Sequence, residues 1–348
     1  MTRLNGLIVF WLGGILPGLQ LNVVAQPTPS GTQFEFPTNN RELLDTGRGP
    51  AFYVGTIGKT WENGQFGCVR SAGWQMHEGL DIRPLEHDEK GESSDEVRAV
   101  ADGEVAYLNR REHKSTYGQY VVLRHTIDGL PVFSLYAHLR AIAEDLQIGN
   151  TTSVGQPIGV LGRTAAISPK ITKEHAHLHF EIAFMLNSQF PKWYNKKYPG
   201  QENSHAEFHG FNLIAIDASE VFLQQAESGE PFSFIEHIRN LPTLFKVRVK
   251  AKQSFEFIRE HISLVKRDRT AEAEGIAGYE LSFTSNGLPS KLKPISASEF
   301  ESDEGYELVS VDETVYESGK CRRYVMKRQG EWILTGRATD LLNLITLK

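Results

Sequence analysis

The sequence predicts a β-rich α+β fold, in which a mostly antiparallel β domain precedes a small C-terminal α+β domain. The chain has 348 residues, of which 40% are hydrophobic, and this length is sufficient for two domains. From Phe66 onward, short apolar runs alternate with turns that contain glycine, a pattern typical of antiparallel strands. After residue 231, both period-two and helical spacings of apolar residues occur, which indicates a mixed second domain.

The first 25 residues have the features of a secretory signal peptide. Arg3 supplies a positive charge, residues 7–12 are continuously apolar, and small residues at 23–25 precede a cleavage point at Gln26. Glycines and a proline then interrupt the apolar run, which is too short for a comfortable membrane span. We expect cleavage, export to the periplasm or the cell exterior, and no stable membrane span afterwards. A retained membrane anchor is the alternative.

Residues 26–50 are polar and rich in turn-forming residues, which predicts a linker or an arm on the surface. Two cysteines, Cys68 and Cys321, are too few for a disulfide framework or a cysteine-ligated zinc site. They form either one disulfide or two free thiols. The net charge of −6 excludes the basic footprint of a nucleic-acid-binding protein.

The expected main domain spans residues 51–230. Within it, the pattern predicts a hairpin over 97–109 and a second strand pair, 120–125 with 132–136, across Asp128-Gly129. A short helix is expected over 141–146. Residues 186–230 form an aromatic-rich wrap, in which we interpret His205 and His209 as solvent-exposed rather than as groups near a metal.

The expected second domain spans residues 231–348 and contains no metal or nucleophile constellation. The predicted elements are a strand over 245–252, a helix over 255–265, the hairpins 279–283/291–295 and 323–327/331–334, and a helix over 338–347. The role of this domain is not indicated by its sequence.

Residues 175–181, with the sequence HAHLHFE, predict a strand that carries histidines on one face. Because alternate side chains share a face, His175, His177, His179 and Glu181 point one way and the apolar residues point the other. Such a row is poor core filling, but neutral imidazole is a common ligand for zinc and copper.

Two further motifs precede this strand. His77-Glu78-Gly79-Leu80-Asp81 offers a histidine and a carboxylate around a sharp glycine turn. With one histidine of the later strand they make three protein ligands and leave the fourth position of a tetrahedral site open, as in catalytic zinc sites. His138, in Leu135-Tyr136-Ala137-His138-Leu139, ends another apolar run.

The motifs H-x-G-x-D, Y-x-H-L and H-L-H-F occur in that order, with Gly155-Gln156-Pro157-Ile158-Gly159 between the second and third. Together they resemble the lysostaphin-type (LytM-like) zinc metallopeptidases that cut peptidoglycan peptides, over about residues 50 to 185. The resemblance implies a β-sheet metallopeptidase domain with a groove and one Zn²⁺ per chain. It also implies that His77, Asp81 and His179 are the metal ligands and that His138 and His177 are catalytic. The segment 165–174 departs from the family pattern because it is bulkier and charged, which implies a different groove wall.

The function implied by the resemblance is that of an exported zinc metalloendopeptidase, which hydrolyses peptide bonds in peptidoglycan cross-links. A peptidoglycan peptide is therefore the expected partner. Two alternatives remain: a wall-binding or amidase-activating module that has lost its zinc, and a zinc D,D-carboxypeptidase or dipeptidase. The presence of all three ligands favours an enzyme. Glu181 either orients a ligand histidine or belongs to the groove, and His175 is expected to have no direct role.

Overall fold

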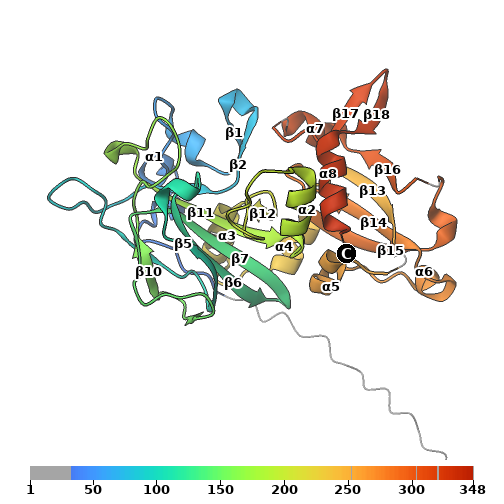
Figure 1. The fold of residues 1–348 in the computed structure, drawn as a ribbon, viewed down its shortest axis with the longest axis horizontal. Coiled ribbons are helices and arrows are strands. Elements are labelled where there is room, and N and C mark those ends of the chain that lie inside the picture. The colour runs from blue at the N-terminus through green and yellow to red at the C-terminus, as the bar shows by residue number, and fades with distance from the viewer. Residues whose placement is uncertain (1–32, 252, 303, 320, 348) are drawn as a thin grey trace, which may run out of the picture.

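The computed structural model describes residues 33–251, 253–302, 304–319 and 321–347. The expected signal peptide, residues 1–25, lies outside the described residues. Among the described residues, no helix is both long and apolar enough to cross a membrane. Two parts lie side by side, a larger β-sheet part and a C-terminal part built around a separate sheet (Figure 1). This arrangement confirms the predicted fold class.

The larger part is built on a seven-stranded sheet in which every pairing is antiparallel. The strand order is β12-β11-β7-β6-β5-β9, and β3 also pairs with β11. The strands are β3 (Leu80–Ile82), β5 (Gly103–Asn109), β6 (Gln119–Ile127), β7 (Leu130–Leu139), β9 (Thr151–Thr152), β11 (Leu178–Met185) and β12 (Leu213–Ile216). The predicted pair across Asp128-Gly129 is confirmed as β6 and β7, and both turn residues have the positive φ angles (54° and 73°) that such tight hairpin turns require.

The predicted hairpin over residues 97–109 is wrong. β4 (Glu96–Arg98) pairs with β10 (Pro157–Val160) in a small sheet that also holds β8 (Ala141–Ile142). β5 instead joins the main sheet beside β6. At Gly103 a Cβ atom would come within 2.7 Å of the Arg124 carbonyl, so the chain passes too close to β6 for a larger residue. The turn at Asp102-Gly103 therefore connects β4 of the small sheet with β5 of the main sheet.

The helix predicted over 141–146 is also wrong, because this segment begins with β8 and continues as turns. Its backbone is hydrogen-bonded across the small sheet, with Ala143 N–H donating to the Ile158 carbonyl at 3.0 Å. Pairing with a distant strand has therefore overridden the local helical preference.

The described part of the expected arm over residues 26–50 contains buried side chains. Phe34 and Phe36 are 4% and 7% exposed. Phe34 exchanges two hydrogen bonds with the Gln225 side chain on α3 (Ala218–Ser228), at 2.8 and 2.9 Å. Residues 33–40 thus pack against the main domain rather than merely lying on it.

The C-terminal part contains a four-stranded antiparallel sheet of order β15-β14-β13-β16 and a two-stranded hairpin, β17-β18. The two predicted hairpins of this region are confirmed. Its strands are β13 (Phe245–Lys250), β14 (Gly278–Phe283), β15 (Pro289–Ile295), β16 (Tyr306–Val311), β17 (Val325–Arg328) and β18 (Glu331–Leu334). The remaining α-helices of the described residues are α1 (Gly49–Phe52), α2 (Phe190–Lys197), α4 (Phe234–Asn240), α5 (Glu256–Glu260), α6 (Arg269–Glu274), α7 (Glu313–Ser318) and α8 (Gly336–Ile345).

The two parts share one buried apolar cluster, which runs from Phe34 and Leu80 to Leu342. Polar groups also cross between them, since the Asn187 amide donates to the carbonyls of Leu344 and Leu347 at 3.1 and 3.0 Å. The division at residue 231 remains a proposal, and these contacts attach the C-terminal part closely to the larger one.

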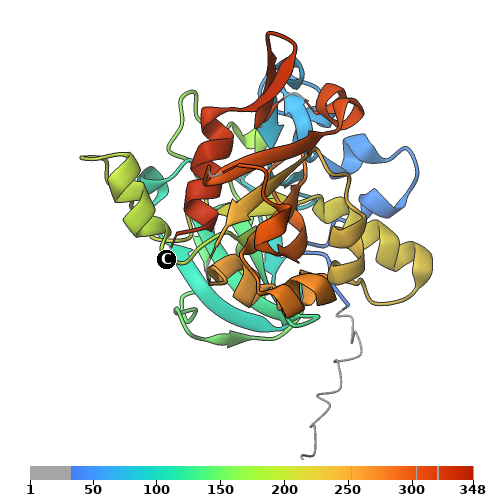
Figure 2. The same cartoon turned by 90° about the vertical axis from the view of Figure 1, so that its right-hand side faces the viewer.

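A third connection is the disulfide between Cys68 on β1 (Gly67–Arg70) and Cys321, which lie 253 residues apart. It decides between the two alternatives that the sequence left open. β1 pairs with β2 (Gln75–His77), and Figures 1 and 2 both show this pair beside the β17–β18 end of the C-terminal part. Disulfides persist mainly in oxidising compartments, so the bond agrees with a location outside the cytoplasm.

Replacing both Cys68 and Cys321 with serine should lower the free energy of unfolding by about 2–5 kcal/mol, because the bond closes a very long loop of the unfolded chain. Calorimetry of this variant beside the wild type, with a reducing agent added to a second wild-type sample, measures the change. Equal melting temperatures in all three samples would contradict the expectation.

Candidate metal centre

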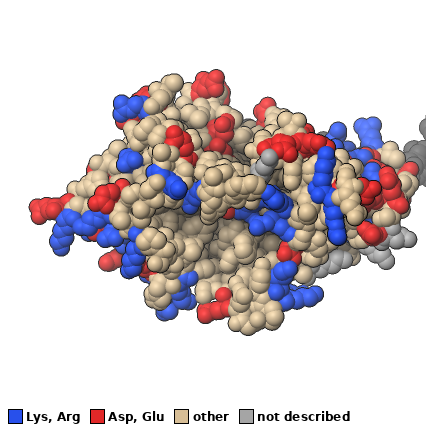
Figure 3. Space-filling view, turned by 90° about the horizontal axis from the view of Figure 1, so that it is seen from above, with Lys and Arg blue, Asp and Glu red and all other residues tan. Residues whose placement is uncertain are grey.

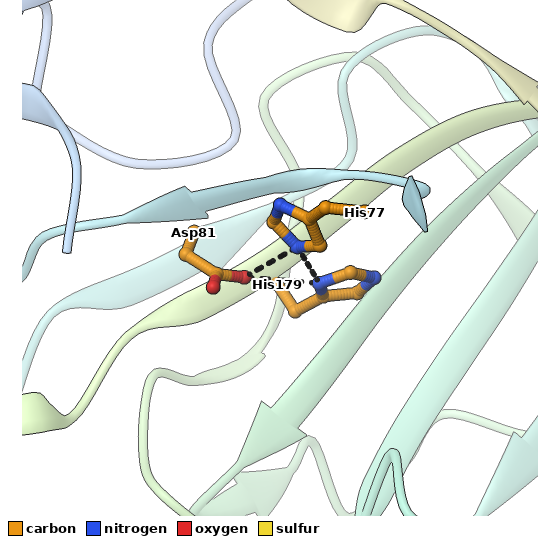
Figure 4. A group of neighbouring side chains, drawn as sticks. All are labelled: His77, Asp81 and His179. Atoms are coloured by element: carbon orange, nitrogen blue, oxygen red, sulfur yellow. Dashed lines mark hydrogen bonds and ion pairs between the residues drawn. The ribbon is translucent and has the colours of Figure 1, made fainter. Parts of the chain in front are cut away.

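Three buried side chains, His77, Asp81 and His179, converge from β2, β3 and β11 (Figure 4). His77 Nε2 lies 3.1 Å from both Asp81 Oδ1 and His179 Nδ1, and His179 Nδ1 lies 3.0 Å from Asp81 Oδ1. The sheet register produces this, because Asp81 on β3 stands opposite His179 on β11. The sequence-predicted ligands are therefore brought together.

Gly79 allows the His77–Asp81 turn to lie against β11. A Cβ atom on this residue would come within 2.6 Å of the Phe180 carbonyl and 2.9 Å of His179 Cε1. Any larger residue would push the turn away from β11 and separate His77 from His179. The glycine of the H-x-G-x-D motif is thus explained by close approach.

Hydrogen bonds orient the two imidazoles. His77 Nδ1–H donates to the Gln65 carbonyl at 2.7 Å, and His179 Nε2–H donates to Glu181 Oε1 at 2.8 Å. The other nitrogen of each ring, His77 Nε2 and His179 Nδ1, then faces the carboxylate. Two imidazole nitrogens and one carboxylate oxygen, all within 4.8 Å of one another, are a donor set that fits zinc.

Asp81 is held as a carboxylate. Burial alone would raise its pKa, but hydrogen bonds and charges from His177, His77 and His179 hold the pKa well below its ordinary value. Its second oxygen accepts a hydrogen bond from Arg70 Nη2 at 2.5 Å. No motif in the sequence marks Arg70, so its contact with Asp81 could not be predicted.

Glu181 lies behind His179, where it is 1% exposed and also accepts a hydrogen bond from the Tyr117 hydroxyl at 2.7 Å. Of the two roles considered for Glu181, this position agrees with orienting a ligand histidine. Burial raises the pKa of Tyr117 well above its ordinary value, so its hydroxyl keeps the proton that it donates. Tyr117 lies in a loop, and no pattern in the sequence identified it.

His138 and His177 lie beside the three-residue group. Their ring centroids are 4.8 Å apart, and His177 Nε2 is 3.5 Å from Asp81 Oδ1. Each Nδ1–H donates to a backbone carbonyl, from His138 to Thr164 at 2.8 Å and from His177 to His175 at 2.7 Å. Burial lowers the pKa of both rings below the ordinary value. Both are therefore neutral at pH 7 in the metal-free protein, with an Nε2 lone pair available.

His175 does not share the strand face with the other histidines, so that prediction is wrong. It ends a one-turn helix, Lys173–His175, and β11 begins only at Leu178. Pairing of β11 with β3 starts at Leu178 opposite Ile82, and the chain before this point has no strand partner. The His175 ring instead is hydrogen-bonded to Thr172 Oγ1 at 2.9 Å.

Replacing His175 with alanine should leave zinc content unchanged and activity within about twofold of the wild type, because the ring contacts neither the ligands nor the cavity. Its carbonyl, which holds His177, is retained in this variant. Elemental analysis and peptide cleavage measure the two quantities. Loss of zinc in this variant would show that the wrong histidine has been assigned as a zinc ligand.

His205 and His209 are not the solvent-exposed residues expected from the sequence. His205 is 8% exposed and is hydrogen-bonded to the Tyr107 hydroxyl at 2.9 Å. The aromatic-rich wrap packs over β5, and Phe208 stacks on Tyr107. Both histidines line the cavity above the candidate metal centre, although neither lies among the three grouped residues that could hold a metal ion.

The cavity above the metal centre has a volume of about 700 Å³ and is open to solvent. His77, His138 and His179 lie at its wall together with Ile167, from the segment that departs from the family pattern. Arg322 and Arg337 of the C-terminal part also line it. Seen from above, the surface is hollowed near its middle, and side chains of both charge signs lie around the hollow (Figure 3).

The affinity for zinc should rise with pH. Burial alone would lower the pKa of His179, but hydrogen bonds with Asp81 and Glu181 outweigh burial and raise the pKa to about 9. Below that pH, zinc must displace a proton from His179, so affinity should gain about tenfold per pH unit from about pH 7 to 8. Zinc competition with a chelator measures this. Glu181→Gln removes one of the causes and should flatten the slope, and a pH-independent affinity in the wild type would contradict the expectation.

Residues 75–191 match the family model of Peptidase family M23, and this range contains all five predicted site residues. The resemblance inferred from the motifs is thereby confirmed. No curated protein matches the chain.

Several solved structures resemble the chain. A putative peptidase M23 from Pseudomonas aeruginosa is 17% identical, with 44% of this chain aligned to 46% of that chain and a TM-score of 0.27. The catalytic domain of lysostaphin from Staphylococcus simulans is 20% identical, with 38% of this chain aligned to 75% of that chain and a TM-score of 0.25. A putative glycyl-glycine endopeptidase lytM from Ruminococcus gnavus is 22% identical, with coverage of 44% and 48% and a TM-score of 0.27. The chain thus spans less than half of the Pseudomonas chain.

Proposed function

Because residues 75–191 match the family model of Peptidase family M23, we propose that this protein is a zinc metalloendopeptidase that hydrolyses peptide bonds in peptidoglycan cross-links. One observation carries the proposal. Two neutral histidines stand beside a buried His-Asp-His group at the wall of an open cavity, and each of the two has its Nδ1–H fixed by a backbone carbonyl. A merely structural histidine cluster would have no need of an open cavity.

In this proposal His77 Nε2, Asp81 Oδ1 and His179 Nδ1 hold the zinc ion. Zinc in such a site polarises a carbonyl and lowers the pKa of water, which is the chemistry that amide hydrolysis needs. Glu181 keeps His179 in the tautomer that binds metal, and Gln65 does the same for His77. Arg70 fixes the orientation of the Asp81 carboxylate.

His138 and His177 supply the proton transfers. In the neutral form each Nε2 accepts a proton, so one of the two rings takes the proton of the attacking water. The charged ring then becomes a donor, which returns the proton to the leaving amine or stabilises the developing oxyanion. The carbonyls of Thr164 and His175 hold the rings in place during these steps.

We further propose that residues 1–25 are a signal peptide that directs export. The Cys68–Cys321 disulfide supports a location outside the cytoplasm, where peptidoglycan is found. We also propose residues 51–230 as the peptidase domain and 231–348 as an attached domain, although the C-terminal part contributes side chains to the cavity.

Mass spectrometry of purified peptidoglycan after digestion tests the proposed function. We expect new amino and carboxyl termini within the cross-links, no products after chelation, and recovery when zinc is restored. The release of single C-terminal residues would instead identify a carboxypeptidase. A folded, zinc-loaded protein that binds the wall but yields no products would identify a non-catalytic module.

A further inference from the structure

The C-terminal segment around residue 322 is fastened to the hairpin that carries His77. Cys321 is bonded to Cys68, and Arg322 donates to the Glu78 carboxylate, next to His77. Arg323 lies over the ring of Trp74, 4.5 Å from its centroid. Three successive residues are thus anchored on β1 and on the residues that flank β2, and Arg322 lies at the edge of the cavity.

Arg322 and Arg337 stand between two cavities. Both line the cavity of about 700 Å³ at the metal centre and a second one of about 230 Å³. The second cavity is walled mainly by apolar side chains, among them Trp193, Tyr198 and Leu341. A peptide that extends from the metal centre towards the second cavity must therefore pass the two guanidinium groups.

The positive charge at this position is not neutralised. The Arg337 side chain is exposed and forms no hydrogen bond or ion pair with any described residue. Its acidic neighbour along α8, Asp340, is paired with Lys197 at 2.7 Å. The side chain of Arg322 is only 12% exposed and is already ordered by Glu78.

The other charged side chains that line the cavity at the metal centre do not neutralise Arg337. Its lining contains three arginines and one acidic residue, Glu78. Arg70 is paired with Asp81, and Glu78 is paired with Arg322. The described lining residues therefore leave Arg337 without a counter-ion, beside a cavity that opens onto the metal centre.

We propose that Arg322 and Arg337 form a subsite that binds a carboxylate of the substrate peptide next to the bond that is cut. This deepens the proposed function and rests on it. A guanidinium group offers paired N–H donors that match the two oxygens of a carboxylate, and Arg322, which Glu78 already orders, loses little freedom when it binds. The C-terminal part is thus a wall of the substrate groove that selects acidic peptides.

Two synthetic cross-linked stem peptides test the subsite, one with a free carboxylate beside the scissile bond and one with that group amidated. For the wild type we expect the amidated peptide to have a KM about tenfold higher, with kcat unchanged. Arg337→Gln should raise the KM for the acid by about the same factor and leave the amide unaffected. Arg337→Lys should restore part of the loss.

Arg328→Gln is the matched control, because Arg328 is exposed on β17 and lines neither cavity. Arg322→Lys keeps a positive charge for Glu78 but loses the planar fork, so it should weaken binding of the acid only. Equal effects of Arg337→Gln on acid and amide, or no effect on either, would overturn the subsite.

Different results would overturn the subsite and the proposed peptidase function. If the wild type cleaves both peptides with equal KM, the subsite is wrong and the peptidase remains. If it cleaves neither, the peptidase is wrong, and calorimetric binding of the two peptides to wild type and Arg337→Gln decides about the subsite. About tenfold weaker binding of the acid alone by the variant supports it, and equal binding overturns it.

Discussion

Replacing His179 with alanine should remove both bound zinc and peptidase activity. His179 Nδ1 is one of three grouped donor atoms, and its ring also links Asp81 to Glu181. Loss of a partner behind a ligand already costs about 10–100-fold in metal affinity, so the loss of a ligand should exceed about 100-fold. The variant also leaves a buried carboxylate, Glu181, without its imidazole partner, so we expect lower stability as well.

Zinc content by elemental analysis and cleavage of a cross-linked peptide measure the two effects. Circular dichroism confirms that the variant is folded, and His175→Ala serves as the matched control on a histidine that contacts no ligand. A His179→Ala protein that keeps one zinc per chain would show that the three grouped side chains are not the metal site.

His138→Ala and His177→Ala should each keep the zinc and lose activity. Neither ring belongs to the three grouped ligands, so metal affinity should change little. General acid–base groups contribute about 10²–10⁴-fold and lost oxyanion stabilisation costs about 10²–10³-fold, so kcat should fall by two or more decades in each variant. The double variant should fall by much less than the product of the two, because both rings act on one reaction.

Single-turnover cleavage, measured beside zinc stoichiometry, separates binding from chemistry for these variants. Near wild-type cleavage by either single variant would remove that histidine from the mechanism. Loss of zinc in His177→Ala would make His177 a ligand, which its distance of 3.5 Å from Asp81 Oδ1 makes the most direct alternative.

The sequence was sufficient to predict the side chains that the sheet brings together. Strand alternation placed His177, His179 and Glu181 on one face, and the H-x-G-x-D turn placed His77 close to Asp81. Both patterns are local, and the β3–β11 pairing that joins them is short. Local patterns did not decide which distant strand pairs with which, so the partners of β4 and β5 were wrong. They also did not show that β11 begins only at Leu178, after both His175 and His177.

Residues that act through long-range contacts could not be predicted. Arg70 and Tyr117 lie in segments without a motif, and only the folded sheet brings them to Asp81 and Glu181. Arg322 and Arg337 lie more than 240 residues beyond His77, and they reach the cavity because the C-terminal part is attached to the larger part through a shared apolar cluster and the Cys68–Cys321 bond. Two cysteines in a sequence do not establish that they pair. The contribution of the C-terminal part to the groove wall therefore could not be predicted either.

The central claim is a zinc ion held by His77, Asp81 and His179, and anomalous X-ray scattering at the zinc edge from a crystal of the zinc-loaded protein tests it most directly. We expect one peak per chain, about 2.0–2.2 Å from His77 Nε2, Asp81 Oδ1 and His179 Nδ1, with His138 and His177 beyond bonding distance. A crystal without a peak at this position, or with the ion bonded to His138 or His177 in place of one of the three, would contradict the account.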